Sequence, residues 1–469
     1  MKKLLLFILL AFQLAAVKAQ NDTIIFTTLG HYYYNPFTFN SVYSPLIDRM
    51  GRPYVYGAAT TVGITIFDIS NTMSPTVAYT ITPAMMNNED GSYCAQENNY
   101  LFVATGNLQA SGQMAGLSIF DITNPVAPQL LDHWDSTAFT HGSSQVIVQG
   151  NYAYLAALDD GIIILDISNV NNIHFCSHLN MTTITCLNNN HARGLYLSND
   201  TLLVANDCGG LRVVDVTNKY APVQTGSYKN AAYGSGIPYY NHVWRLGDHA
   251  YIPVDYCGFE VDNVANPAAI TNEAMWNPFG CNSGNWNGAP MHANEITWVS
   301  PAANAFMLSG GDSEVLAFDP SNPMQPRLMG AWGPPNDSTG AWGIDVYNGL
   351  VAIGTIKTPV PFYSVHGGLQ LLSWNLILGT DDQQFQTSAL KLCPNPATSV
   401  CTIALPETKD ASFTIDVMDV MGRVVKTEIV NANITGRNAE IDLGDLSAGV
   451  YVVRAGSAHA MCEGRVVKE

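Results

Sequence analysis

The hydrophobic and polar positions of the chain repeat in a unit of about 50 residues. Each unit holds an apolar run, a short loop, Gly, four mostly apolar residues, Asp and a turn. Four copies keep this form, namely Gly63-Ile-Thr-Ile-Phe-Asp68, Gly116-Leu-Ser-Ile-Phe-Asp121, Gly161-Ile-Ile-Ile-Leu-Asp166 and Gly210-Leu-Arg-Val-Val-Asp215. Three degenerate copies follow, at 258–263, 314–319 and 368–373. Because the runs are short, β-branched and bounded by Gly or Pro, they predict strands and not helices.

Seven copies at this period predict an all-β fold, a seven-bladed β-propeller at residues 20–380. Turn residues such as Ile122-Thr-Asn-Pro125 follow the Asp. Since Asp and Asn accept hydrogen bonds from backbone amides two residues on, they favour tight turns there. The segment Thr23-Ile-Ile-Phe-Thr-Thr28 is an extra strand ahead of the first unit. We expect it to complete the last blade and to latch the ring.

The repeat is similar to that of a known family. Tyr152-Ala-Tyr-Leu-Ala156, followed by Gly161-Ile-Ile-Ile-Leu-Asp166, resembles the LVIVD repeat, named for its Leu-Val-Ile-Val-Asp consensus. The resemblance covers about 350 residues of the chain. It implies a secreted or surface propeller, and it brings no agreed activity.

A second module is predicted at residues 390–469, after a polar linker at 381–389. Runs at 414–420 and 450–454 read as strands of a small immunoglobulin-like β-sandwich. Three ordered motifs, Pro394-Asn-Pro396, Asp419-Val-Met-Gly-Arg423 and Leu446-Ser-Ala-Gly-Val-Tyr451, resemble the C-terminal sorting domain of type IX secretion. Cys393 departs from the Tyr or Phe usual in that family. The resemblance implies that the type IX secretion machinery is a partner and that the protein is translocated across the outer membrane. It also implies that the domain is then removed and that the protein is released or attached at the cell surface. The alternative is that the module is an ordinary accessory sandwich.

The N-terminus predicts a signal peptide at residues 1–19. Lys2 and Lys3 precede the apolar stretch 4–10, and Val17-Lys-Ala19 fits the small-x-small cleavage rule. The apolar stretch is shorter than the roughly 20 residues that a membrane span needs, so we expect no transmembrane segment.

Charge and cysteine content narrow the possible partners. The chain has 38 acidic and 20 basic residues, a net charge of −18, which argues against nucleic acid, since binding it needs a basic surface. Export permits disulfides, and we expect the local pairs Cys176/Cys186 and Cys257/Cys281. With nine cysteines, at least one stays unpaired or pairs outside the chain.

Four histidines recur at intervals of 50, 51 and 50 residues, namely His141, His191, His242 and His292. Each precedes the first strand of its blade, which in a propeller lies near the central channel. Four neutral imidazoles around one axis could bind Zn, Fe or Cu, with Glu295 either orienting a ligand or acting as general base, and with Arg193 and Arg245 holding an anionic group. The alternative is that each His bonds within its own blade, because repeat ancestry alone reproduces the spacing.

Aromatic residues give a second candidate surface. Trp276, Trp286 and Trp342 occur in loops rich in Gly, Asn and Pro, where rings bind sugars or peptides or else pack between blades. Two functions therefore stay open. The first is an exported binding protein for a glycan, peptide or protein. The second is a metalloenzyme, a hydrolase or oxidoreductase, with Zn or Fe on the propeller axis.

Overall fold

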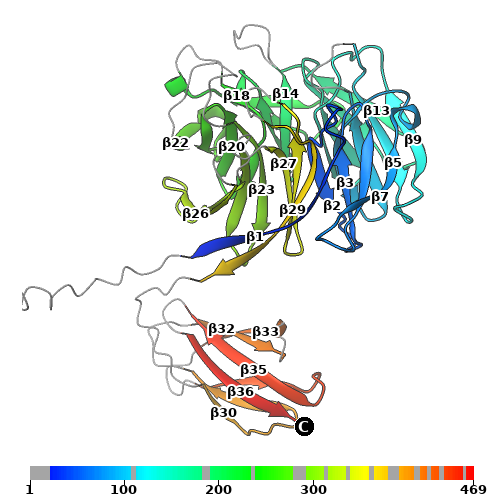
Figure 1. Ribbon diagram of the computed structural model, residues 1–469. Coiled ribbons are helices and arrows are strands. Elements are labelled where there is room, and N and C mark those ends of the chain that lie inside the picture. Colours follow the sequence, from blue (N-terminus) through cyan, green and yellow to red (C-terminus); the bar gives the residue numbers. More distant parts are fainter. Residues whose placement is uncertain are drawn as a thin grey trace, which may run out of the picture. The chain divides into compact units, whose positions relative to one another are not determined.

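The computed structural model describes part of each predicted module. The residues described are 22–106, 112–181, 191–233, 238–277, 292–310, 315–333, 339–358, 364–378, 390–405, 412–419, 424–431, 438–457 and 461–469. The expected signal peptide and the expected linker lie outside these ranges. The chain divides into two compact units, Asp22–Ile377 and a second one that includes Leu378–Glu469 (Figure 1).

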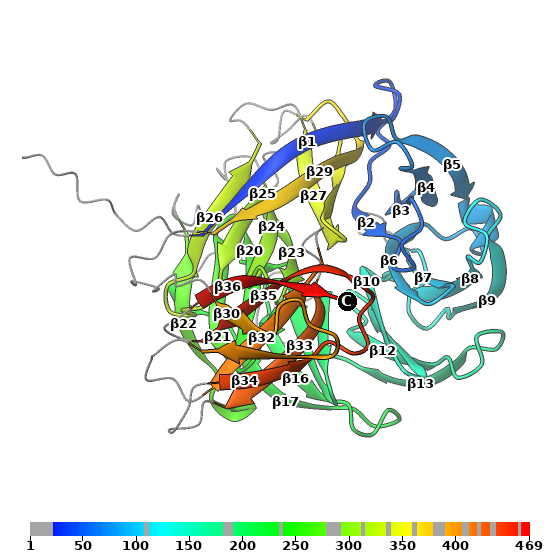
Figure 2. The same ribbon diagram turned by 90° about the horizontal axis from the view of Figure 1, so that it is seen from below.

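Seven antiparallel sheets make up the first unit and are arranged around a ring (Figure 2). Within each sheet, the strands lie side by side from the centre of the ring to its rim. Blades 1 to 4 follow chain order from the inner to the outer strand. Their strands are β2 (Ser44–Ile47), β3 (Tyr54–Ala58), β4 (Ile64–Asp68) and β5 (Thr76–Ile81); β6 (Gly91–Glu97), β7 (Tyr100–Thr105), β8 (Gly116–Asp121) and β9 (Gln129–Asp135); β10 (Gln145–Gln149), β11 (Tyr152–Ala156), β12 (Ile162–Asp166) and β13 (His174–Leu179); and β14 (Ala192–Ser198), β15 (Thr201–Asn206), β16 (Gly210–Asp215) and β17 (Val223–Tyr228).

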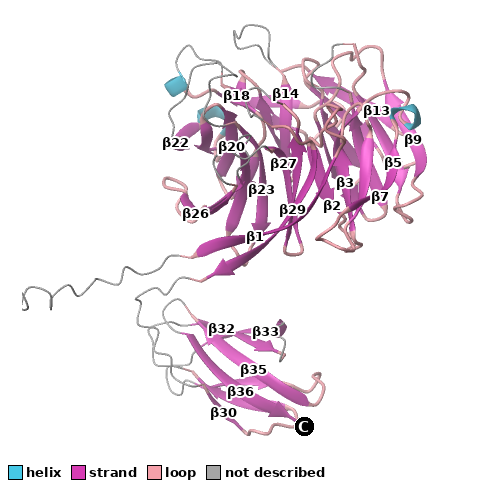
Figure 3. Cartoon of the chain, viewed as in Figure 1, coloured by secondary structure: helices cyan, strands magenta, loops and turns pink. Residues whose placement is uncertain are grey.

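Blades 5 to 7 vary this plan. Blade 5 has β18 (Tyr239–Tyr240), β19 (Trp244–Leu246), β20 (His249–Asp255), β21 (Gly258–Asn263) and β22 (Thr271–Trp276). Blade 6 has β23 (Ala293–Ser300), β24 (Ala305–Gly310), β25 (Val315–Asp319) and β26 (Arg327–Trp332); blade 7 has β27 (Gly340–Tyr347), β28 (Leu350–Ile356), β29 (Gly368–Ile377) and β1 (Thr23–Tyr33). The helices described are single 3-10 turns, Pro83–Met85, Ala231–Tyr233 and Pro267–Ala269 (Figure 3). The predicted seven-bladed propeller is confirmed.

The N-terminal strand closes the ring. β1 pairs antiparallel with β29, from Thr23 opposite Ile377 to Tyr33 opposite Gly368. It thus supplies the outermost strand of blade 7, whose other three strands come from the end of the propeller. The predicted latch is confirmed, and the strand is longer than the segment 23–28 that the sequence marked.

The repeated Asp stabilises a turn by accepting a hydrogen bond from the backbone. In blade 3, Asp166 Oδ1 accepts a hydrogen bond of 2.8 Å from the Ser168 amide, and Asp68, Asp121, Asp215, Asn263 and Asp319 make the same contact in their blades. This contact fixes the turn between the third and fourth strands. Blade 7 needs no such turn, because its fourth strand arrives from the N-terminus. That explains why Ser373 stands at the equivalent position.

Blade 5 is irregular at its inner edge. β18 and β19 both pair with β20, and residues 241–243 between them lie opposite only two residues, Ile252 and Pro253. The inner strands of blades 2, 4, 6 and 7 shift register at the equivalent place, without a Pro opposite. The irregularity in blade 5 is a β-bulge next to His242, and bulges of this kind change the direction of a side chain.

Neighbouring blades pack face to face through apolar side chains. Leu117 and Ile119 of blade 2 pack with Leu155 and Ile163 of blade 3, and all four are fully buried. Burying one such side chain contributes about 1.5–3 kcal/mol relative to leaving it in water. Repeated around the ring, these contacts hold the inner strands in fixed places around the channel.

The second unit is a β-sandwich. One sheet has β30 (Lys391–Cys393), β31 (Val400–Ala404) and β34 (Asn438–Asp442); the other has β33 (Val424–Asn431), β32 (Ser412–Met418), β35 (Gly449–Gly456) and β36 (Met461–Lys468). Both sheets contribute to one core, for example Ile403 and Ile415. Asn395 of the Pro-Asn-Pro motif binds β36, accepting from the Val467 amide at 2.9 Å and donating to the Arg465 carbonyl at 2.7 Å.

Two sequence expectations concern cysteines and membrane spans. Cys176 has a free thiol, so the predicted Cys176/Cys186 pair is wrong. Cys257 and Cys208 are each disulfide-bonded, whereas Cys186 and Cys281 lie outside the described residues. In the part of the chain that the structure describes, no helix is both long and apolar enough to cross a membrane.

Candidate functional site

The inner strands bring one residue of each blade to the same level of the central channel. These residues share a register position, since Ser44, Tyr93, Gln145 and Gly194 all lie opposite an Ala of the second strand, and Gly343 lies opposite Gly354. We call this level the belt; it consists of Ser44, Tyr93, Gln145, Gly194, His242, Glu295 and Gly343.

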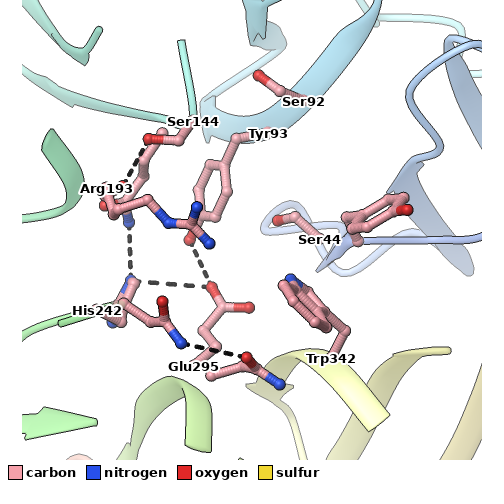
Figure 4. A pocket seen from close by; sticks show the side chains of 12 residues that line it. Ser44, Ser92, Tyr93, Ser144, Arg193, His242, Glu295 and Trp342 are labelled. Atoms are coloured by element: carbon pink, nitrogen blue, oxygen red, sulfur yellow. Dashed lines mark hydrogen bonds and ion pairs between the residues drawn. The ribbon is translucent and has the colours of Figure 1, made fainter. Parts of the chain in front are cut away.

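Four belt side chains meet across the channel (Figure 4). Tyr93 Oη donates to Glu295 Oε1 at 2.8 Å, and the Ile344 amide donates to Glu295 Oε2 at 2.9 Å. Gln145 Nε2 lies 2.9 Å from His242 Nε2. The two pairs approach each other where His242 Nε2 and Glu295 Oε1 are 3.9 Å apart, which is too long for a hydrogen bond.

Glycine at two belt positions leaves room for these contacts. A Cβ atom at Gly194 would collide with the backbone of Asn241 and His242. At Gly343 it would collide with the carbonyl of Tyr43 and press against Glu295. The belt therefore accommodates Ser44 of blade 1 and the longer side chains of blades 2, 3, 5 and 6, and it excludes side chains from blades 4 and 7.

Burial keeps the belt uncharged near neutral pH. It raises the pKa of Glu295 to about 8, although the Ile344 amide and Tyr93 stabilise the carboxylate, and it lowers the pKa of His242 to about 4. The hydrogen bonds also assign the proton of the imidazole. Gln145 Oε1 accepts from the Leu195 amide, so its Nε2 donates to His242 Nε2, and the proton of His242 resides on Nδ1.

The belt separates two cavities on the axis. The upper cavity, about 60 Å³, lies at the start of the inner strands and is lined by the residue preceding each belt position, namely Tyr43, Ser92, Ser144, Arg193, Asn241, Asn294 and Trp342. The lower cavity, about 320 Å³, lies further along the same strands. Tyr93, Gln145, His242 and Glu295 line both cavities.

Arg193 is the charged side chain of the upper cavity. Its guanidinium points into the cavity beside Tyr93 and above Glu295 (Figure 4), and its Nε lies 3.8 Å from Asp207 Oδ1. The other lining groups are hydroxyls, amides, aromatic rings and the neutral belt. Trp342 meets Tyr43 edge to face, with 5.9 Å between ring centroids.

The four periodic histidines do not occupy equivalent positions. His242 is on the belt, His191 and His292 lie three residues before it in their blades, and His141 lies four residues before Gln145. The spacing near 50 residues follows the length of the repeat, but the belt positions of blades 3 to 6 are separated by 49, 48 and 53 residues, so the four histidines fall at different offsets from the belt. Equal spacing therefore does not make the four imidazoles converge.

Three of these histidines lie beside one or two carboxylates each. His191 lies 3.0 Å from Asp159 and 2.9 Å from Asp207, and His141 lies 3.1 Å from Asp160. His292 is fully buried, with its Nδ1 2.8 Å from Asp255. Among the described residues, no group of three or more His, Cys, Asp or Glu side chains is arranged to hold a metal ion. The metal centre stays a prediction, and this geometry does not add support to it.

The remaining candidates divide between the cavities and the periphery. Arg193, Trp342 and Glu295 come together, as described above. Arg245 lies on β19, where its Nε donates to the Gly247 carbonyl at 2.7 Å, and it lines neither cavity. Trp276 packs between blades 5 and 6, with its ring centroid 5.8 Å from that of Phe259 in its own blade and 4.9 Å from that of Phe318 in blade 6. Trp286 lies outside the described residues.

Sequence reasoning missed most of the belt and of the upper cavity. Tyr93 and Gln145 share no residue type with the other belt positions, and Asn recurs in only two blades, at 241 and 294, so a search for one repeated residue does not find these positions. They share a register position on the inner strand, which is known only once the strands are paired.

Comparison with known proteins identifies both modules. Residues 53–82, 142–180 and 190–230 match the LVIVD repeat, and residues 391–469 match the family described as secretion system C-terminal sorting domain. No curated protein is significantly similar in sequence. The sorting domain indicates secretion or attachment to the outer-membrane cell surface, and it implies interaction with the secretion machinery.

The solved structures that this chain is similar to include two propellers. The WD40 β-propeller domain of Doa1 has 11% identity and a TM-score of 0.48, over 76% of this chain and 97% of that one. The β-propeller domain of Myceliophteria thermophila Cps50 (Swd1) has 13% identity and a TM-score of 0.48, over 75% and 99%. The number of blades is established by the seven sheets of this chain itself. The chain therefore contains LVIVD repeats within a seven-bladed β-propeller and carries a type IX sorting domain at residues 391–469.

Proposed function

We propose that this exported protein is a binding protein that holds an anionic end group of a glycan or peptide in the upper cavity of its channel. The observation that carries the proposal is the position of Arg193. It is the one lining side chain with a full charge near neutral pH, since the belt below it is neutral. A guanidinium suits a carboxylate or sulfate because its fork of donors matches two acceptor oxygens.

The size and walls of the cavity support recognition of an end group. Since a water molecule occupies about 30 Å³ of liquid, the cavity of about 60 Å³ has room for a group of a few heavy atoms. Hydroxyl and amide side chains from five blades surround it, and Trp342 offers a ring. The remainder of a glycan or peptide would lie on the loops outside.

Asp207 limits how strongly Arg193 attracts an anion. The carboxylate lies near Nε, however, and the contact of 3.8 Å is longer than a hydrogen bond. The two terminal nitrogens of the guanidinium therefore keep donors to offer. A bound anion adds a charge-assisted contact, which contributes about 1.5–3 kcal/mol, or roughly 10- to 100-fold in affinity.

A matched pair of arginine variants tests the proposal. Mature full-length protein is screened on glycan arrays and peptide libraries that include neutral and acidic members, and the screen is repeated with Arg193→Gln and Arg245→Gln. We expect acidic ligands in the screen, a loss of at least about tenfold in affinity with Arg193→Gln, and little change with Arg245→Gln. Absence of any ligand, a preference for neutral ligands, or equal effects of the two variants would contradict the proposal.

A further inference from the structure

The lower cavity is a second feature of the channel, distinct from the site of the proposed function. Its volume of about 320 Å³ is roughly twice the ~150 Å³ of an engineered cavity that binds benzene. It also falls at the small end of the range of about 300–1,000 Å³ typical of ligand pockets. All seven blades contribute to its wall, so the cavity lies on the axis.

One side of this cavity is apolar. Alternate residues of an inner strand face the channel, so Ile147 follows Gln145 on β10, and Tyr196 follows Gly194 on β14. Trp244 of β19 lines the cavity in the next blade. The rings of Tyr196 and Trp244 meet edge to face at 4.9 Å between centroids. Blades 3, 4 and 5 thus form a continuous wall with two aromatic rings.

The opposite side is polar, and its charges are paired. Thr297, Asp345 and Arg49 come from blades 6, 7 and 1. Arg49 Nη2 lies 2.6 Å from Asp345 Oδ1, while Asp345 Oδ2 accepts from the Ile47 amide at 2.7 Å. The carboxylate has both oxygens engaged, so it does not demand a cationic ligand.

The end of the cavity toward the belt offers hydrogen bonding without charge. His242 is buried, and its Nδ1 has no hydrogen-bond partner among the described residues. The tautomer assigned above makes Nδ1 a donor. A ligand group that accepts a hydrogen bond would satisfy it, and Arg49 Nη1, which also has no partner among the described residues, is a second donor for such a group. An ionised ligand would bring a charge next to an Arg49–Asp345 pair whose two charges already neutralise each other.

From these walls we infer that the lower cavity binds a small, flat, uncharged aromatic molecule with a polar substituent. The apolar wall of blades 3 to 5 takes the ring, because aromatic pairs gain about 0.5–1.5 kcal/mol beyond area burial. The wall of blades 6, 7 and 1, together with the belt, takes the substituent. The volume suits a single ring or a fused pair of rings.

Two probes that differ in charge test the inference. Indole and indole-3-carboxylate share a ring system, and their binding to the full mature chain is measured at pH 7 by calorimetry and ligand-observed NMR. We expect indole to bind with Kd below about 1 mM, and the carboxylate to bind at least about tenfold more weakly. No binding of indole, or equal or tighter binding of the carboxylate, would overturn the inference.

Two variants locate the binding. Tyr196→Leu keeps an apolar side chain and removes a ring, so it should weaken indole binding about 2- to 13-fold. Tyr100→Leu makes the same change on β7, outside both cavities, and should leave the affinity unchanged. Ile147→Trp should block the cavity, with Tm and circular dichroism confirming that each variant is folded. Equal affinities for all variants would place indole elsewhere and refute the assignment, and none of these outcomes bears on Arg193 and the upper cavity.

Discussion

Replacing Glu295 by Gln tests whether the belt holds a neutral carboxyl group. Burial raises the pKa of Glu295 from 4.5 to about 8, so the folded protein keeps a proton that the unfolded chain releases above pH 4.5. The contribution of this group to stability is therefore best below pH 4.5 and becomes progressively worse as the pH rises to 8. Gln cannot ionise, yet it retains the shape and an oxygen that accepts from the Ile344 amide.

The size of the effect follows from the pKa difference. One pKa unit corresponds to about 1.4 kcal/mol, so the penalty removed by the variant grows to roughly 5 kcal/mol at most between pH 4.5 and 8. The parent protein should lose stability relative to Glu295→Gln by up to about 1.4 kcal/mol per pH unit in this window. The titration of His242 is present in both proteins and largely cancels in the difference.

Urea unfolding followed by tryptophan fluorescence at pH 5, 6, 7 and 8 provides the measurement. Glu97→Gln, at the exposed end of β6, is the matched control and should show no such trend. A difference between Glu295→Gln and the parent that stays constant from pH 5 to 8 would refute the neutral carboxyl. It would also remove the argument that Arg193 is the sole charge of the upper cavity.

Three further predictions concern the scaffold. Deleting residues 22–33 removes β1 and exposes the edge of β29, so Tm should fall and blade 7 should become sensitive to protease; an unchanged Tm would argue against the latch. Asp166→Ala removes the acceptor for the Ser168 amide and should lower the free energy of unfolding in urea by about 1 kcal/mol. Ser373→Ala, at a position where no such turn follows, should lower it by less than about 0.5 kcal/mol. Similar losses in the two variants would contradict the explanation of the degenerate repeat. Burial raises the pKa of Asp262 to about 9, with the carboxyl group of Glu260 beside it, so stability should fall as pH rises from 4 to 9 in the parent and fall less in Asp262→Asn; parallel profiles of Tm against pH would show that Asp262 is ionised throughout.

The architecture was predictable from sequence because its chemistry recurs in recognisable residues. The third strand of a blade ends in a turn that needs an Asp or Asn acceptor, and Gly63, Gly161 and Gly210 adopt the positive φ angles that other residues avoid. The turn with its Asp or Asn acceptor recurs in six of the seven blades, so the sequence displays it. The latch was predictable for the same reason, since a lone apolar strand preceded the first unit.

The channel was not predictable in this way, because its function depends on differences between blades. Belt positions hold Tyr, Gln, His and Glu in four blades and Gly in two, and only their register unites them. The histidine spacing does not give the four histidines one register position, because the belt positions of blades 3 to 6 are separated by 49, 48 and 53 residues. Cys176 shows a similar limit, since closeness along the chain to Cys186 did not produce a bond.

Because β1 is the N-terminal strand, closure of the ring depends on the order of synthesis and on proteolysis at the N-terminus. The strand is synthesised first, but its partner β29 is among the last propeller segments to appear, so every earlier blade must wait with an open ring. Cleavage after Ala19 would leave only three residues ahead of Thr23. An aminopeptidase that advanced a dozen residues beyond that point would remove β1 as far as His31 and with it most of the pairing with β29, so we expect such trimming to shorten the lifetime of the folded ring.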